Sequence, residues 1–120
     1  MEAMRELQRD RWVQYLQDVT GELRNVAVVI EVAAPGKDTR VEARRMPLLA
    51  LAYDQRDDVF EVAAANGGPH LPAVLRHMVD HPVRIEVDSP AADNPTMISV
   101  TAEDGARTTV RIVPEGAFAG

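Results

Sequence analysis

The sequence predicts a two-layer α+β domain with a mostly antiparallel sheet of about seven strands and two helices, in the order α-ββββ-α-βββ. Short runs of β-branched or alternating apolar residues are separated by turn residues, which is typical of strands joined as hairpins. Two other segments carry apolar residues at spacings of three and four, which is typical of amphipathic helices. A partly closed β-barrel with helices is the alternative, because residue patterns do not separate an open sheet from a closed one.

The first predicted helix covers residues 10–20, where Trp12, Tyr15, Leu16 and Val19 form one apolar stripe. Asp10 is its expected N-cap. Gly21 is expected to end it in the left-handed conformation, with Leu23 packing back on the stripe.

Four strands are predicted next, as two hairpins. Residues 26–34 and 39–46 flank a Pro-Gly turn at 35–38, and residues 48–53 and 59–65 flank the polar turn 54–58. Pro47 interrupts the alternation, so we place a strand boundary there. The segment 66–69, "NGGP", ends this region as a turn.

A second helix is predicted over residues 71–81. Pro72 suits its first turn, Pro82 ends it, and five apolar residues follow helical spacing. Three further strands, residues 83–89, 96–102 and 107–113, complete the sheet as a meander. The five apolar residues of the helix are Leu71, Val74, Leu75, Met78 and Val79.

The strands are two-sided. One face collects apolar residues and is the predicted core: Val28, Ile30, Val32, Val41, Phe60, Val62, Val83, Ile85, Val87, Ile98, Val100, Val110 and Ile112. The opposite face carries charges of both signs, which is typical of a solvated antiparallel sheet. It is also our candidate interaction face, formed by Glu31, Glu42, Arg44, Glu61, Arg84, Glu86 and Arg111.

Composition limits the class of protein. A chain of 120 residues suits one domain, which we place at 1–113 with a flexible C-terminal tail at 114–120. The formal charge of −6 disfavours nucleic-acid binding, and the absence of cysteine excludes disulfides, thiol nucleophiles and Cys-containing metal sites. No signal peptide or membrane span is evident, so we expect a cytoplasmic protein. All but one of the basic residues are arginine, which suggests a bacterial source.

All three histidines lie in the segment "HLPAVLRHMVDH", residues 70–81. His77 and His81 stand four apart, the helical spacing of a metal-ligand pair. On the predicted helix both lie on the shoulder of the apolar stripe, and His70 precedes it. A zinc site needs at least three ligands, so we predict no bound metal and no cofactor. His70, His77, Asp80 and His81 remain a candidate polar or ligand-binding cluster.

Other catalytic patterns are absent from the sequence. Neither Ser89 nor Ser99 lies in a nucleophile elbow, and the turn 54–58 lacks the glycine and the final glutamate of a calcium loop. The arginines near residues 40–45 lack the exposed aromatic residues of a nucleic-acid-binding sheet.

The order of the segments resembles a family of small bacterial proteins known as domain of unknown function 5335. In that family a helix with a Trp precedes a strand, an "EAR-x-(L/M)-P-L" segment follows, and a "P-x-x-V" stretch leads to a final hairpin with an acidic "DG" turn. The corresponding pieces here are Trp12, residues 42–48, residues 82–85, and Asp104 with Gly105. The resemblance covers residues 8–113 and implies no catalytic residue, cofactor or substrate.

We therefore expect a non-enzymatic module that acts through contact with an unidentified protein or as a homodimer, using the mixed-charge face or an open strand edge. The alternative is a small-molecule binding protein or a hydrolase. Its pocket would lie between the helix at 71–81 and the sheet, with His77 or His81 as general base and Glu86 or Asp80 as its orienting carboxylate.

Overall fold

The computed structural model describes residues 4–23, 26–65, 73–89, 91 and 95–114. A short strand, β1 (Arg5–Leu7), and a 3-10 turn, η1 (Arg9–Arg11), lead into helix α1 (Trp12–Glu22). The rest of the described chain is strands and their connections. The strands are β2 (Val26–Ala33), β3 (Arg40–Asp54), β4 (Val59–Ala65), β5 (Val74–Asp80), β6 (Pro82–Val87), β7 (Met97–Ala102) and β8 (Arg107–Pro114).

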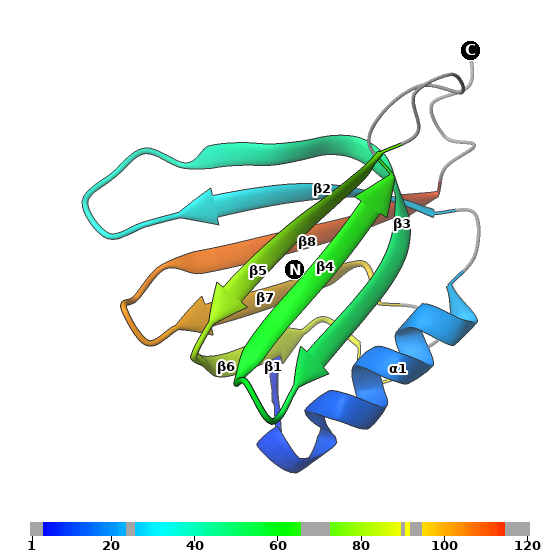
Figure 1. The fold of residues 1–120 in the computed structure, drawn as a ribbon, viewed down its shortest axis with the longest axis horizontal. Coiled ribbons are helices and arrows are strands. Elements are labelled where there is room, and N and C mark those ends of the chain that lie inside the picture. Colours follow the sequence, from blue (N-terminus) through cyan, green and yellow to red (C-terminus); the bar gives the residue numbers. More distant parts are fainter. Residues whose placement is uncertain (1–3, 24–25, 66–72, 90, 92–94, 115–120) are drawn as a thin grey trace.

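The eight strands form one sheet in the order β1-β6-β7-β8-β2-β3-β4-β5, and every neighbouring pair is antiparallel. The sheet bends at β3, so that β4 and β5 lie across the face of β7 and β8 (Figure 1). Strands β1 and β5 remain at opposite ends of the order and do not pair, so the barrel alternative is wrong. The antiparallel sheet and the β6-β7-β8 meander are confirmed.

The predicted second helix is wrong, because the segment forms strand β5. Its seven residues pair with β4 from Val59 opposite Asp80 to Ala65 opposite Val74. The apolar residues of this seven-residue segment fit the spacing of a helix and the two-residue alternation of a strand equally well. Pairing decides between them, since a helix this short is only marginally stable by itself and the edge of β4 supplies main-chain hydrogen bonds.

The strand boundary at Pro47 is also wrong, since β3 runs through it for 15 residues. Pro47 is the last residue of β3 that pairs with β2, and Leu48 is the first that pairs with β4. A register shift lies on each side of it, one of them marked by Arg45 with a φ of 50°. Proline is tolerated in a sheet at such irregular positions. No pattern in the sequence indicated β1, which pairs with β6.

The apolar stripe of α1 is confirmed, because all four of its residues are buried. Its ends differ from the prediction. Asp10 lies in the 3-10 turn and not at the N-cap. Gly21 lies inside the helix, which ends at Glu22, and the N–H of the next residue, Leu23, donates to the carbonyl of Val19. The expected packing of Leu23 against the core is confirmed.

The core lies between the bent halves of the sheet and is sealed at one end by α1. The predicted core face is confirmed at ten positions: Val28, Ile30, Phe60, Val62, Ile85, Val87, Ile98, Val100, Val110 and Ile112 are buried. Val41 and Val83 are exposed because each lies beside a register shift, where the alternation changes phase. Val32 is half-buried.

Candidate functional site

Strand β5 separates the residues of the predicted histidine cluster. His77 is on the inner face of the sheet with Leu75 and Val79, Asp80 is on the outer face, and His81 lies in the turn to β6. His70 lies outside the described residues. The pocket proposed beneath a helix at 71–81 does not exist in this form, because there is no helix, and Glu86 lies on β6 without a contact to either described histidine.

His77 bridges the two halves of the bent sheet. Its Nε2 lies 3.2 Å from the hydroxyl of Thr108 on β8, and Thr108 itself is buried. Burial lowers the pKa of His77. The charge of Glu42 raises it by a smaller amount, and the charge of Arg40 lowers it further. A neutral imidazole hydrogen-bonded to a hydroxyl group is the expected state at neutral pH.

His81 belongs to a second polar group, which the sequence did not predict. Its Nδ1 lies 3.1 Å from Oδ2 of Asp58, and Tyr53 donates to the other oxygen of Asp58 at 2.6 Å. Arg9 donates to the Tyr53 hydroxyl at 3.2 Å and to the carbonyl of Pro82 at 3.1 Å. We call Arg9, Tyr53, Asp58 and His81 the corner network. It joins η1, β3, the β3–β4 turn and the β5–β6 turn.

The backbone at the corner network is unusual. Asp58 and His81 have φ values of 55° and 53°, in the left-handed region, and the N–H of His81 donates to the carbonyl of Asp58 at 2.9 Å. Asp and His are among the residues that tolerate this conformation best, and the hydrogen bonds hold both turns in it. The contact exists because β4 pairs with β5, which brings the two turns together. The sequence of residues 54–58 alone indicates a solvated turn, because the residue that Asp58 contacts, His81, is distant in the sequence.

Chemically, the corner network has the carboxylate-imidazole pair of a general base. However, Asp58 already accepts from Tyr53, and both His81 and Asp58 are open to solvent. Among the described residues, no group of three His, Asp or Glu side chains is arranged to hold a metal ion. The hydrogen bonds of the corner network hold the β3–β4 turn and the β5–β6 turn together.

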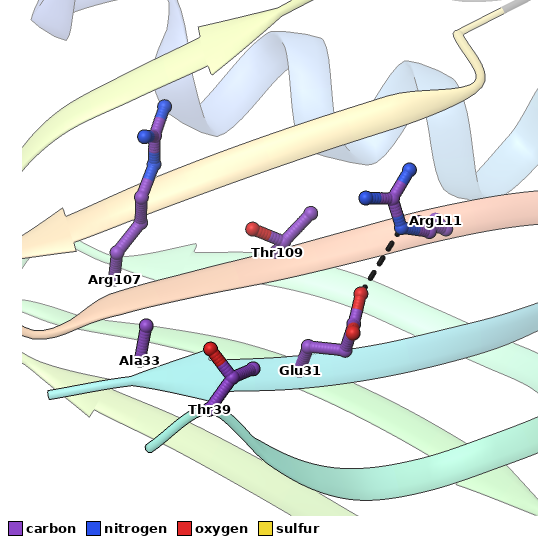
Figure 2. Close-up of a pocket in the computed structure, with 6 residues that line it drawn as sticks. All are labelled: Glu31, Ala33, Thr39, Arg107, Thr109 and Arg111. Atoms are coloured by element: carbon purple, nitrogen blue, oxygen red, sulfur yellow. Dashed lines mark hydrogen bonds and ion pairs between the residues drawn. The ribbon is translucent and has the colours of Figure 1, made fainter. Parts of the chain in front are cut away.

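The candidate interaction face is divided by the bend. Glu31, Glu86, Arg84 and Arg111 lie on the outer face of β6, β8 and β2. Arg111 donates to Glu31 at 3.0 Å beside a shallow pocket (Figure 2), and Arg84 lies 3.8 Å from Glu6. Glu42 accepts from Arg40 at 2.6 Å near His77, and Arg44 is exposed near the first register shift of β3. Glu61 lies on the outer face of β4.

The two arginines of that shallow pocket are already paired. Besides the Arg111 pair, Arg107 donates to the hydroxyl of buried Ser99 at 2.6 Å and lies 3.5 Å from Glu86. The pocket holds about 200 Å³ and is lined by residues of β2, β8 and the β2–β3 turn (Figure 2). Its lining has two arginines and one carboxylate, but each arginine is paired, Arg111 with Glu31 and Arg107 with Glu86 outside the lining, so neither offers an unpaired charge to a ligand.

A third surface lies on the outer face of the second half of the sheet. Small residues of β3 and β4 lie there beside larger exposed residues of β5. The end of the face at the β3–β4 turn is acidic. We call this surface the alanine face. It consists of Leu49, Ala50, Ala52, Glu61, Ala63, Ala65, Val74, Arg76 and Met78.

Comparisons with known proteins identify the family. The model of the Family of unknown function (DUF5335) matches residues 3–117. The chain belongs to this family. Among curated proteins it is similar to an uncharacterised protein of Aquifex aeolicus (strain VF5), with 31% identity over 112 residues, 93% of this chain and 94% of the relative. No solved structure matches.

The family has no activity attached to it, so any role must be argued from the surfaces described above. The predicted resemblance is confirmed by the family match. In the described part of the chain, no helix has the length and apolar character to cross a membrane.

The two described histidines are expected to titrate in opposite directions from their ordinary pKa of 6.5. The hydrogen bond to Asp58 raises the pKa of His81, aided by the charges of Asp58, Glu103 and Asp80, whereas burial lowers that of His77. Protonated His81 therefore stabilises the fold at acidic pH, and this contribution disappears as the pH rises through its folded pKa. Neutral His77 contributes above pH 6.5, and its contribution disappears as the pH falls through its lowered pKa.

NMR titration of the imidazole protons checks this. His77→Gln and His81→Gln assign the two signals. Equal titration of both at the ordinary value would contradict the structure and would fit two exposed side chains on a helix.

Proposed function

We propose that this protein is a non-enzymatic interaction module that associates with a second copy of itself through the alanine face. The observation that supports this most is the exposure of large apolar side chains on one face of the sheet. Met78 is 54% exposed, Val74 52% and Leu49 48%. Contiguous exposed apolar surface rimmed by polar residues is typical of protein contact sites.

The alanine face is well shaped for packing against another sheet. Across β3, β4 and β5, Ala50, Ala63 and Arg76 are register partners, and so are Ala52, Glu61 and Met78. The alanine side chains in the middle of the face are short, so the backbone of a partner can approach closely. Met78 fills irregular gaps well because its side chain is flexible and polarizable.

The charges on the face are complementary to themselves. Oε1 of Glu61 is shielded from solvent and has no hydrogen-bond donor in the described part of the chain, although Nη1 of Arg76 lies 3.5 Å away. The Glu61 side chain as a whole is 28% exposed and that of Arg76 64% exposed, so both can still meet a partner. When two copies meet about a two-fold axis, each contributes the same patch, so the Arg76 of one copy can pair with the exposed part of the Glu61 carboxylate of the other.

Replacing Met78 with lysine is expected to abolish association. The change replaces an apolar side chain in the contact by an ammonium group. Although Glu61 is its register partner, desolvating this charge in the contact still costs about 3 kcal/mol, so the dimer dissociation constant should rise by about 100-fold. Sedimentation equilibrium measures it, with the wild type expected at twice the chain mass of 13.2 kDa.

Val83→Lys is the matched control. Val83 is 50% exposed, but it lies on β6, outside the alanine face. It should leave the dimer constant unchanged. A wild type that stays monomeric at about 100 μM, or a Val83→Lys protein that dissociates as readily as Met78→Lys, would refute the proposed contact.

A further inference from the structure

We propose that the free edge of β5 and the groove beside it bind an extended, basic segment of another protein, which adds to the sheet as a ninth strand. This goes beyond self-association, since it uses the edge of β5 and its inner side. Among the described residues, Met78 of the alanine face also lines the groove, so the two sites are tested separately, with groove variants that leave Met78 unchanged.

The edge of β5 is open and regular. In the described part of the chain β5 has one sheet neighbour, β4, and the two pair over seven consecutive residues without a register shift. Native proteins usually protect such an edge with a bulge, a proline or charged side chains. Residues 74–80 contain no bulge, no proline and no lysine, and their two charged side chains, Arg76 and Asp80, lie on the outer face of the strand. The opposite edge, β1, has three residues and offers far fewer main-chain groups.

A groove runs beside this edge. One hollow of about 230 Å³ lies between His77–Asp80 of β5 and residues of β2, β7 and β8. A second hollow, of about 260 Å³, continues it past the β5–β6 turn and shares Asp80 and Asp104 with the first. The walls opposite β5 are small or apolar, formed by Val32, Ala102, Ala106 and Thr108. Such a channel accepts alternate side chains of a strand.

The shape of the sheet selects a single strand as the occupant. The hairpins β2–β3 and β7–β8 extend well past β5 (Figure 1), and their residues form the far wall of the groove. A whole second domain paired to β5 would meet these hairpins. An extended segment, in contrast, would lie along the groove and pair its main chain with β5, as in strand addition to other exposed sheet edges.

The charge of the groove selects a basic segment. Asp80, Glu103 and Asp104 line its two hollows, and no arginine or lysine is among the described lining residues. Two histidines also line the groove. His77 bonds to Thr108 and is held neutral by burial, and His81 is paired with Asp58, so neither offsets these carboxylates. With a chain charge of −6, the field favours the approach of a cationic partner.

The test uses a fluorescein-labelled peptide of ten residues that alternates lysine and valine, with binding followed by fluorescence anisotropy. Three comparison peptides separate the contributions. One alternates glutamate and valine, one carries N-methyl groups on alternate amides, and one has the same residues in scrambled order. We expect binding of the first peptide only, because N-methylation removes the main-chain donors that pair with β5.

Variants of the protein locate the site. Asp80→Asn with Asp104→Asn removes two charges from the groove. The side-chain amide oxygen introduced by Asp104→Asn can still accept from the Ala106 N–H, as the Asp104 carboxylate does at 2.9 Å. This variant should bind the peptide about 10-fold more weakly. Asp18→Asn with Glu22→Gln makes the same charge change on α1 and should not alter the affinity.

Slower amide exchange at residues 74–80 on adding the peptide would place it on β5. The proposal is wrong if the peptide does not bind at about 1 mM, if the N-methylated peptide binds equally, or if the two double variants lose affinity alike. None of these results bears on the dimer, which is measured without peptide.

Discussion

Replacing Trp12 with alanine is expected to lower the free energy of unfolding by about 3–5 kcal/mol. Trp12 is 1% exposed, and its ring packs edge-on against Tyr53 with centroids 5.0 Å apart. The guanidinium carbon of Arg9 lies 4.3 Å from the ring centroid, and the indole N–H donates to the carbonyl of Leu7 at 3.0 Å. The side chain thus joins β1, η1, α1 and β3 at the base of the corner network.

Trp12→Phe is the control for this prediction. It keeps an aromatic ring but removes the indole N–H and part of the volume, so a smaller loss of about 1–2 kcal/mol is expected. Urea unfolding followed by circular dichroism compares the three proteins, since the chain has no second tryptophan to report by fluorescence. Equal stability of Trp12→Ala and the wild type would contradict the packing described.

Replacing Thr20 with valine is expected to lower the free energy of unfolding by about 1–3 kcal/mol, although the two side chains have nearly the same shape. The Thr20 hydroxyl accepts from the N–H of Leu51 at 2.9 Å. It lies 2.9 Å from the carbonyl oxygen of Leu16 and 3.0 Å from that of Leu51, either of which can accept its one proton. Beyond Pro47, β3 has lost β2 as a neighbour, and α1 runs beside it instead (Figure 1). Thr20 therefore satisfies main-chain groups that a strand would otherwise pair.

Thr20→Ser separates the hydrogen bond from the methyl group. It retains the hydroxyl and should recover most of the stability that valine loses. If the valine variant is as stable as the wild type, the hydrogen bonds of the Thr20 hydroxyl do not contribute and the prediction is wrong.

The parts of the fold that depend on local pairing could be predicted from the sequence. In β6, β7 and β8, apolar residues such as Ile85, Ile98 and Val110 alternate with polar ones, and a short turn joins β7 to β8. The Pro35-Gly36 turn is likewise local, with Gly36 at a φ of 72°. For these elements the sequence contains both the strand period and the turn chemistry.

The other parts of the fold depend on contacts between residues that are distant in the sequence. Residues 74–80 form a strand because β4 lies beside them, and their spacing alone fits a helix as well. His81 meets Asp58 only because that pairing brings two turns together, so the interpretation of His77 and His81 as neighbours on one helix was wrong. The alanine face was missed for the same reason: Met78 and Val74 were assigned to a buried helical stripe, whereas the structure leaves them exposed.

The central claim, self-association through the alanine face, is tested most directly by complementary charge variants. Glu61→Arg gives the face two cations and Arg76→Glu gives it two anions, so each protein alone should be monomeric. Mixed together, they should form a heterodimer, visible by native mass spectrometry as one species containing one copy of each. If each variant dimerises alone as well as the wild type does, or if the mixture stays monomeric while the wild type dimerises, Glu61 and Arg76 do not meet across the contact and the account is wrong.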